Sequence, residues 1–199
     1  MMTLHTAPLR RRLLAAAVAA LAAGCAQITH VATGDTVVRE RLTVTVDKAW
    51  NQFPNGLGEG IPTWTQDGVT VDALRFYVGL KDGALLAPTP SAPKGTKPLA
   101  FASSMQTADI VGLFEALYSR GGSQFTLDRV EPARFAGQPG FRFEFSSIRK
   151  LDEVRLKGIA WGAVHQGELF VVTYTAPRLG FFDRHVKSAE AIAASARIR

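Results

Sequence analysis

The first apolar stretch of the chain is short and follows directly on three arginines at positions 10–12. Residues 13–23 are all Leu, Ala or Val, and the stretch ends at Gly24 and Cys25. A membrane-spanning helix needs about 20 apolar residues, so this stretch is too short to cross a bilayer. A basic segment, a short apolar core and small residues before a cleavage site are instead typical of a secretory signal peptide.

Alternating apolar and polar residues predict strands in the next part of the chain. Residues 26–35 are expected to be a short polar tether, and residues 36–46 a first strand, because Leu, Val and Thr alternate there. Asp67-Gly68 lies between two strand-like runs and predicts a β-hairpin, whose second arm ends near residues 82–83.

Two stretches rich in Gly and Pro are expected to be loops. They are residues 51–62 and residues 87–98. The second stretch is the best candidate for an internal boundary, but the chain before it is too short and too rich in loops to form a core of its own. We therefore expect a single domain.

The apolar spacing changes to a helical period in two places, residues 107–118 and residues 182–195. The pattern between these two predicted helices predicts a succession of strands, with a hairpin turn at residues 165–167. Blocks of strands separated by helices predict an α+β fold, a twisted antiparallel sheet with helices on one face. The predicted strands are residues 125–135, 140–147, 153–162 and 168–176.

Composition changes the picture only after the signal peptide is removed. The full chain has 199 residues and a net charge of +6, but residues 1–24 carry three basic and no acidic residues. Removing them leaves 175 residues with a net charge of +3, which is enough for one domain at residues 36–199. The remaining basic residues are scattered among acidic ones, so we expect no nucleic-acid binding, which calls for a basic stripe.

The end of the apolar stretch, Leu-Ala-Ala-Gly-Cys, resembles the lipobox of bacterial lipoproteins. That resemblance implies cleavage after Gly24, acylation of Cys25 and a lipidated tether over residues 25–35. Several acyl chains together anchor a protein stably, whereas one does so only marginally. Because Ala26 rather than aspartate follows the cysteine, the resemblance implies the outer membrane, with the protein facing the periplasm or exposed at the surface. An ordinary cleaved signal peptide is the main alternative.

A second resemblance covers the C-terminal half of the chain. Residues 137–145 (Gly-Gln-Pro-Gly-Phe-Arg-Phe-Glu-Phe), residues 167–174 (Gly-Glu-Leu-Phe-Val-Val-Thr-Tyr) and a closing helix before Ser195-Ala196-Arg197-Ile198 resemble PsbP-like domains. These domains are α/β/α sandwiches around an antiparallel sheet. Since members mostly bind or scaffold partners, the resemblance implies a non-enzymatic role, while residues 64–83 depart from the family pattern.

The mature sequence offers few residues for catalysis. It contains no nucleophile elbow, no zinc-protease helix motif, no phosphate loop and no EF-hand loop. Its three histidines, His30, His165 and His185, are expected to be solvated, and so no metal or cofactor is expected. Asp67 and Asp72 could form a carboxylate pair, but a turn residue explains one of them better. Ser103 and Ser104 are expected to belong to a polar connecting segment rather than to supply a nucleophile. We predict no enzymatic activity.

Aromatic residues supply the remaining candidates. Phe141, Phe143 and Phe145 share one face of a predicted strand and are expected to pack in the core. Four others could line an apolar groove instead, and the first three of them flank a Gly-rich loop. They are Trp50, Phe53, Trp64 and Phe76. We therefore expect either a scaffold that binds an envelope protein or a carrier that binds a lipid or another apolar molecule between sheet and helix.

Overall fold

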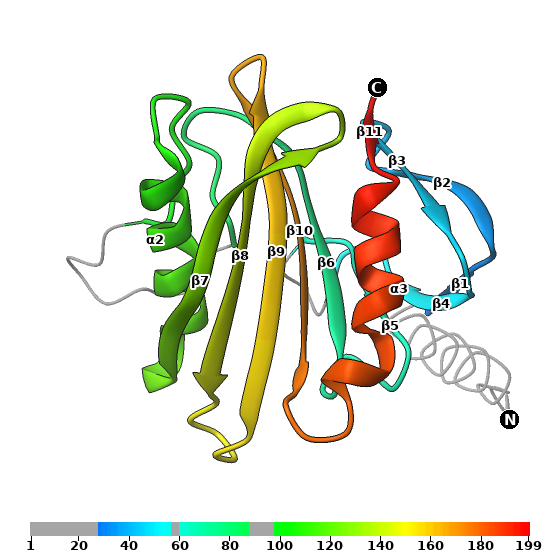
Figure 1. Cartoon of the computed structure of the whole chain (residues 1–199), viewed down its shortest axis with the longest axis vertical. Coiled ribbons are helices and arrows are strands. Elements are labelled where there is room, and N and C mark those ends of the chain that lie inside the picture. Colours follow the sequence, from blue (N-terminus) through cyan, green and yellow to red (C-terminus); the bar gives the residue numbers. More distant parts are fainter. Residues whose placement is uncertain (1–27, 57–59, 88–97) are drawn as a thin grey trace, which may run out of the picture.

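An antiparallel sheet with a helix on each face forms the centre of the protein (Figure 1). The computed structural model describes residues 28–56, 60–87 and 98–199. Within these residues, eight strands form the main sheet in the order β1-β4-β5-β6-β10-β9-β8-β7. Their bounds are β1 Thr29–Val31, β4 Trp50–Phe53, β5 Thr63–Thr65, β6 Ala73–Leu80, β7 Gln124–Phe135, β8 Gln138–Ile148, β9 Arg155–His165 and β10 Glu168–Pro177.

The helices α2 (Thr107–Tyr118) and α3 (Phe182–Ala194) lie on opposite faces of the sheet. Successive strand residues point to opposite faces. On β8, Phe143 packs with Phe114 of α2, whereas Arg142 next to it lies toward Glu190 of α3. The expected α+β fold is confirmed, but the expectation that the helices share one face is wrong. The long strands of the centre carry apolar residues on both faces, so each face needs its own cover.

Under α2, three phenylalanines cross over small residues of the neighbouring strand. Phe141, Phe143 and Phe145 on β8 pair with Gly162, Ala160 and Gly158 on β9. A Cβ atom on Gly158 would overlap the Phe145 ring, and Tyr118 and Phe125 hold that ring from the other side. The absence of side chains at Gly158 and Gly162 therefore makes room for the aromatic row, which confirms the core packing expected of the three phenylalanines.

The N-terminal part of the described chain is more structured than expected. Residues 29–31 of the expected tether form β1, and residues 36–46 form two strands rather than one. These are β2 (Gly34–Val38) and β3 (Leu42–Val46), which make a second sheet with β11 (Arg197–Ile198) in the order β11-β3-β2. Arg39 and Glu40 adopt positive φ values of 49° and 58° and turn the chain between β2 and β3. Alternation alone did not reveal this turn, because it contains neither Gly nor Asn.

The other local predictions hold with small shifts of boundary. The strands β5 and β6 pair as the predicted hairpin, and β9 and β10 pair across residues 166–167. The helix α2 begins at Thr107 as expected, but Gln106 is its N-cap and Asp109 completes a capping box. A 3-10 turn at Arg120–Gly122 follows it. Residues 51–53, expected to be loop, belong to β4.

Several predictions fall on residues outside the described part. They are the signal peptide at residues 1–24, the lipidated Cys25 and the prolines of residues 88–97. In the part of the chain that is described, no helix has the length and apolar character to cross a membrane.

Candidate functional site

The aromatic residues that the sequence suggested for a groove are mostly packed inside the protein. Trp50, Trp64 and Phe76 are almost completely buried in the core between the sheet and α3, whereas Phe53 is half-buried at the end of β4. Trp64 and Phe76 lie with their ring centroids 4.5 Å apart, and Trp50 meets Tyr174 edge-on at 6.5 Å. Three of the four side chains thus fill a core.

That core contains polar atoms without partners. The Nε1 atoms of Trp50 and Trp64 and the hydroxyl of Tyr174 are buried and form no hydrogen bond with any described residue. Burial, together with the nearby carboxylates of Asp72 and Asp67, raises the pKa of the Tyr174 hydroxyl well above its usual value. The hydroxyl therefore stays neutral. A buried unpaired group lowers stability, so this face of the sheet is less well satisfied than the α2 face.

An apolar cleft of about 360 Å³ opens beside β6. It shares only Phe76 with the four aromatic residues named from the sequence. Arg39 lies at the cleft and donates a hydrogen bond to the Gly60 carbonyl. A volume of this size falls at the lower end of the range for small-molecule sites. The remaining wall is formed by Ile61, Pro62, Val78, Leu80 and Leu85.

His185 differs from its expected place, because it is buried in α3 rather than exposed to solvent. Its Nδ1 lies 2.8 Å from the Lys48 ammonium and its Nε2 lies 3.0 Å from the Asp67 carboxylate. Since an ammonium has only donors, Nδ1 accepts and the Nε2 hydrogen is donated to Asp67. Ser188 donates to Asp47 nearby at 2.5 Å. These contacts fix α3 to the turns before β4 and after β5.

This polar group has the residue types of a catalytic site but lacks the arrangement. The Ser188 hydroxyl donates to a carboxylate, and the structure records no hydrogen bond between it and His185. A nucleophile needs a base within hydrogen-bond reach, so the group positions a helix instead. The sequence did not reveal it, because Lys48, Asp67 and His185 come from three distant parts of the chain.

The structure also shows where the other residues considered for a site lie. Asp72 is buried and accepts hydrogen bonds from the Thr65 hydroxyl at 2.6 Å and the Asp67 amide at 2.7 Å, so it holds the turn between β5 and β6. Ser103 and Ser104 are exposed before α2, and His30 is exposed on β1. His165 is half-buried at the end of β9. Across the described ranges, no three His, Cys, Asp or Glu side chains are grouped to hold a metal ion.

The edge strand β7 carries three exposed apolar side chains on one face. Leu127 and Val130 are 41% and 47% exposed, and Pro132 is exposed beside them. They pair with Phe145, Phe143 and Phe141, so they continue the aromatic row outward past α2. We call Leu127, Val130 and Pro132 the β7 margin. A partner that covers this surface would extend an apolar layer that the fold already contains.

The backbone edge of β7 is poorly suited to pairing with another strand. β7 is the last strand of the sheet order, so no described strand lies beyond it. The ladder shifts register between Leu127 and Arg129, and Pro132 has no amide hydrogen to donate. Bulges and prolines protect sheet edges from pairing with other strands. Binding at the β7 margin would therefore use side chains more than strand addition.

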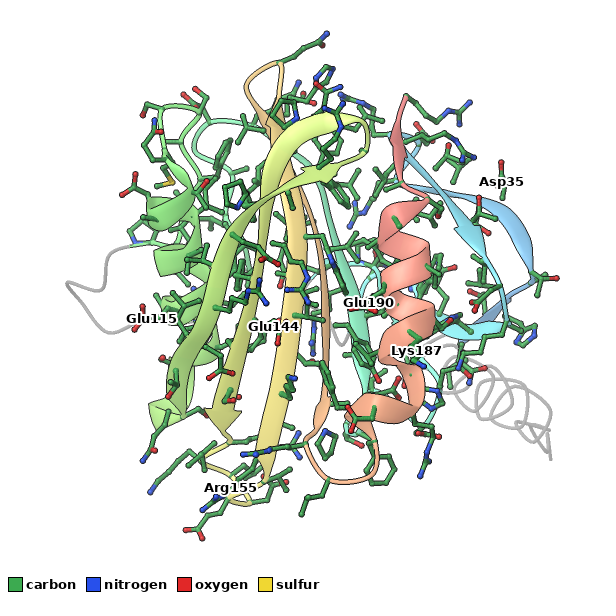
Figure 2. The ribbon with its side chains drawn as sticks, viewed as in Figure 1. Asp35, Glu115, Glu144, Arg155, Lys187 and Glu190 are labelled. Carbon is green, nitrogen blue, oxygen red and sulfur yellow. The ribbon has the colours of Figure 1, made fainter. Side chains whose placement is uncertain are left out.

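The other face of the same strands carries a network of charges. Arg142 on β8 lies 3.0 Å from Glu131 and 2.6 Å from Glu144, and Lys157 lies 3.5 Å from Glu144. Glu190 of α3 approaches Arg142 at 3.9 Å. Figure 2 shows Glu144 and Glu190 on the strand and on the helix facing it. The charged side chains of β7, β8 and β9 on the α3 side of the sheet are thus paired with one another.

The fold has known counterparts, although the sequence itself matches none. No protein-family model and no curated protein matches the chain. Among solved structures, the chain is similar to cyanobacterial PsbP (CyanoP) from Synechocystis sp. PCC 6803, with a TM-score of 0.51 and 14% identity. This likeness covers 89% of this chain and 95% of that chain. It is also aligned with LpqN, involved in cell envelope biogenesis of Mycobacterium tuberculosis, with a TM-score of 0.33, 12% identity and coverage of 86% and 90%.

The likeness to CyanoP establishes the PsbP-like fold and nothing about activity. It extends well beyond the C-terminal half in which the sequence pattern was visible. Fold alone does not determine function, which depends on the site.

Proposed function

We propose that this protein is a lipid-anchored envelope protein that binds a protein partner and is not an enzyme. Its anchor would be Cys25, its location the periplasm-facing surface of the outer membrane, and its contact surface the β7 margin. The observation that carries the proposal is the exposed continuation of the aromatic row by Leu127 and Val130. An apolar surface at the margin of a packed layer is typical of a protein interaction site.

The polar residues of the molecule support a role without catalysis. Asp72 holds a turn, and His185 joins α3 to two other parts of the chain. Each is thus accounted for by the fold. The sequence pattern and the architecture of the chain are both PsbP-like. Both are consistent with a domain that binds a partner through its surface.

The anchor is tested by replacing one atom. We expect Cys25→Ser to abolish labelling with a fatty acid and to release the protein from the membrane fraction, because the sulfur is the attachment point. The matched control is Ser104→Cys in the same chain, which restores a thiol at an exposed place away from the lipobox. Unchanged membrane association of Cys25→Ser, or labelling restored by Ser104→Cys, would contradict the anchor.

The β7 margin is tested by making it polar. We expect Leu127→Ser/Val130→Ser to remove the complexes that a chemical crosslinker traps in intact envelopes. Val37→Ser is the control, because Val37 on β2 is 46% exposed, almost the same as Val130. Both variants should keep the unfolding temperature of the parent, since neither changes a buried side chain. Loss of the complexes in the Val37 variant, or their survival in the margin variant, would overturn this assignment.

The apolar cleft beside β6 supports a second candidate function, the carriage of a lipid or another apolar molecule. Its 360 Å³ and apolar wall fit part of an acyl chain. We expect Val78→Trp to fill the cleft, because Val78 lines it and is half-buried. Organic extraction of protein purified from envelopes, followed by mass spectrometry, would detect a lipid in the parent and not in Val78→Trp. A protein free of lipid would contradict the carrier.

A further inference from the structure

Two loops project from the same end of the sheet, and neither contributes to the β7 margin. They are residues 149–154 between β8 and β9 and residues 178–181 between β10 and α3. Figure 1 shows both at the end opposite the C-terminus, and Figure 2 shows Arg155 there. We call this the loop end of the protein.

Two arginines lie opposite each other at the loop end. The Arg178 amide donates to the Arg155 carbonyl at 2.9 Å, one step beyond the pairing of Pro177 with Leu156. Residues directly opposite in a ladder share a face, and like charges in that arrangement destabilise the pair. Neither guanidinium has a hydrogen bond or ion pair with any residue in the described ranges.

A cleft between these arginines is lined by groups that suit an anion. Its volume is about 140 Å³, and no carboxylate lines it. Ser146 in its wall donates to Asp128, so that hydroxyl is already engaged. Guanidinium groups bind phosphate oxygens through paired hydrogen bonds, and hydroxyl and amide groups add donors. Besides Arg155, Arg178 and Ser146, the lining comprises Gln124, Thr126, Ser147, Ile148 and Leu156.

The acidic groups near the loop end do not pair with these two arginines. Asp152 is held by Arg149, with a separation of 2.7 Å. Glu153 lines an adjoining hollow of about 550 Å³ that shares Arg155 and Arg178 with the cleft, yet it forms no ion pair with either arginine. An anion from outside would thus find two unpaired guanidinium groups.

The loop end also carries the two most exposed large apolar side chains of the described chain. Leu151 is 90% exposed and Leu179 is 85% exposed. Each directly follows a basic residue, Lys150 and Arg178. Leucines that project into water beside cations match a surface that is anionic outside and apolar beneath.

We propose that the loop end docks on an anionic lipid membrane. A headgroup phosphate enters the cleft between Arg155 and Arg178, and Leu151 and Leu179 enter the interfacial layer. This proposal rests on the membrane location in the proposed function, and it adds the orientation that the domain takes on the bilayer. It does not depend on the β7 margin, which lies along the side of the sheet.

The test follows the surroundings of a fluorophore at the loop end. The full chain with Cys25→Ser has no acyl group and no thiol, so Leu179→Cys provides a single site for an environment-sensitive dye. We expect a blue shift of this dye with vesicles of phosphatidylcholine containing phosphatidylglycerol, and none with phosphatidylcholine alone. The control is Gln166→Cys, which places the dye in the exposed β9–β10 turn at the opposite end and should show no shift.

Charge variants test the cleft itself. Arg155→Gln/Arg178→Gln should require roughly thirtyfold more anionic lipid for the same shift, given the usual attraction of each basic residue to such a surface. Arg155→Lys/Arg178→Lys keeps the charge and should retain most of the binding. Leu151→Ser should weaken it as well, without changing the unfolding temperature.

Three results would overturn the proposal. The first is an equal blue shift from dyes at positions 179 and 166. That result would mean that another segment, such as residues 13–23, binds the chain to the vesicle. The second is no effect of the double Arg→Gln change. The third is a shift with inorganic phosphate but none with anionic vesicles, which identifies a free-anion site. Because the assay uses a chain without acyl groups, its failure leaves the Cys25 anchor and the β7 margin intact as separate hypotheses.

Discussion

The two faces of the central sheet are held together in different ways. Under α2, the row of Phe141, Phe143 and Phe145 lies over small residues of β9. Under α3, three buried polar atoms of the core have no partner among the described residues, and a polar group around His185 fixes the helix. The α2 face thus depends on close packing, whereas the α3 face tolerates polar atoms. Substitutions that remove volume and substitutions that remove polar groups should therefore act differently on the two faces.

The largest effect is expected from the centre of the α2 face. Phe143→Ala should lower the free energy of unfolding by about 3–5 kcal/mol, because it leaves a cavity between β8 and Phe114 of α2. Chemical denaturation measures this change. A loss below about 1 kcal/mol would mean that packing does not hold this face.

Adding volume to the same face should also destabilise it. Gly158→Ala should cost about 1–3 kcal/mol, because its Cβ overlaps the ring of Phe145. Phe145→Leu in the same chain should recover part of the loss, since the smaller side chain leaves room for the new methyl group. If the two changes were simply additive in denaturation experiments, the close contact would not be the cause.

A tyrosine on each face of the sheet allows a direct comparison of the polar groups on the two faces. Tyr118 on the α2 face donates its hydroxyl to Thr173 at 3.2 Å, whereas the Tyr174 hydroxyl on the α3 face has no described partner. Tyr118→Phe should cost about 1 kcal/mol, and Tyr174→Phe should be close to neutral or slightly stabilising. Equal losses in thermal unfolding would contradict the difference between the faces.

The smallest effect concerns the charges of the α3 face and depends on pH. Burial raises the pKa of Glu144, but the hydrogen bond and charge of Arg142 and the charge of Lys157 outweigh it and hold the pKa below its usual value of 4.5. A lowered pKa contributes stability above the unfolded-state pKa, and this contribution disappears as the pH falls through the folded-state pKa.

Glu144→Gln should therefore lower stability at pH 7 by less than about 1 kcal/mol, because the Arg142 and Glu144 side chains are still 21% exposed and solvent partly screens the pair. The difference from the parent should shrink as the pH is lowered below 4.5. A difference that stays constant between pH 7 and pH 3 would show that charge is not its origin.

The sequence predicted the elements that depend on local pattern. The helix at residues 107–118 and the long strands of the C-terminal half are visible because their spacing is regular over ten residues or more. The turn at Arg39 and Glu40 was missed, since both are non-glycine residues with positive φ. The tether was predicted too long, because β1 is only three residues and pairs with the distant β4.

The site residues were harder to predict, because they depend on contacts between distant segments. His185 meets Lys48 and Asp67 across separations of 137 and 118 residues, which no local pattern reveals. The exposure of Leu127 and Val130 likewise depends on where α2 ends and on the place of β7 at the edge of the sheet. By contrast, the prediction for Cys25 came from a local motif.

Position-specific photo-crosslinking in intact envelopes tests the proposed function most directly. A photoreactive residue at Val130 is compared with one at Val37, which is 46% exposed against 47% for Val130. Binding at the β7 margin should give one discrete protein adduct from position 130, none from position 37, and loss of the adduct when Cys25→Ser removes the anchor. The same adduct from both positions, or none from position 130 in the anchored protein, would contradict binding at the β7 margin.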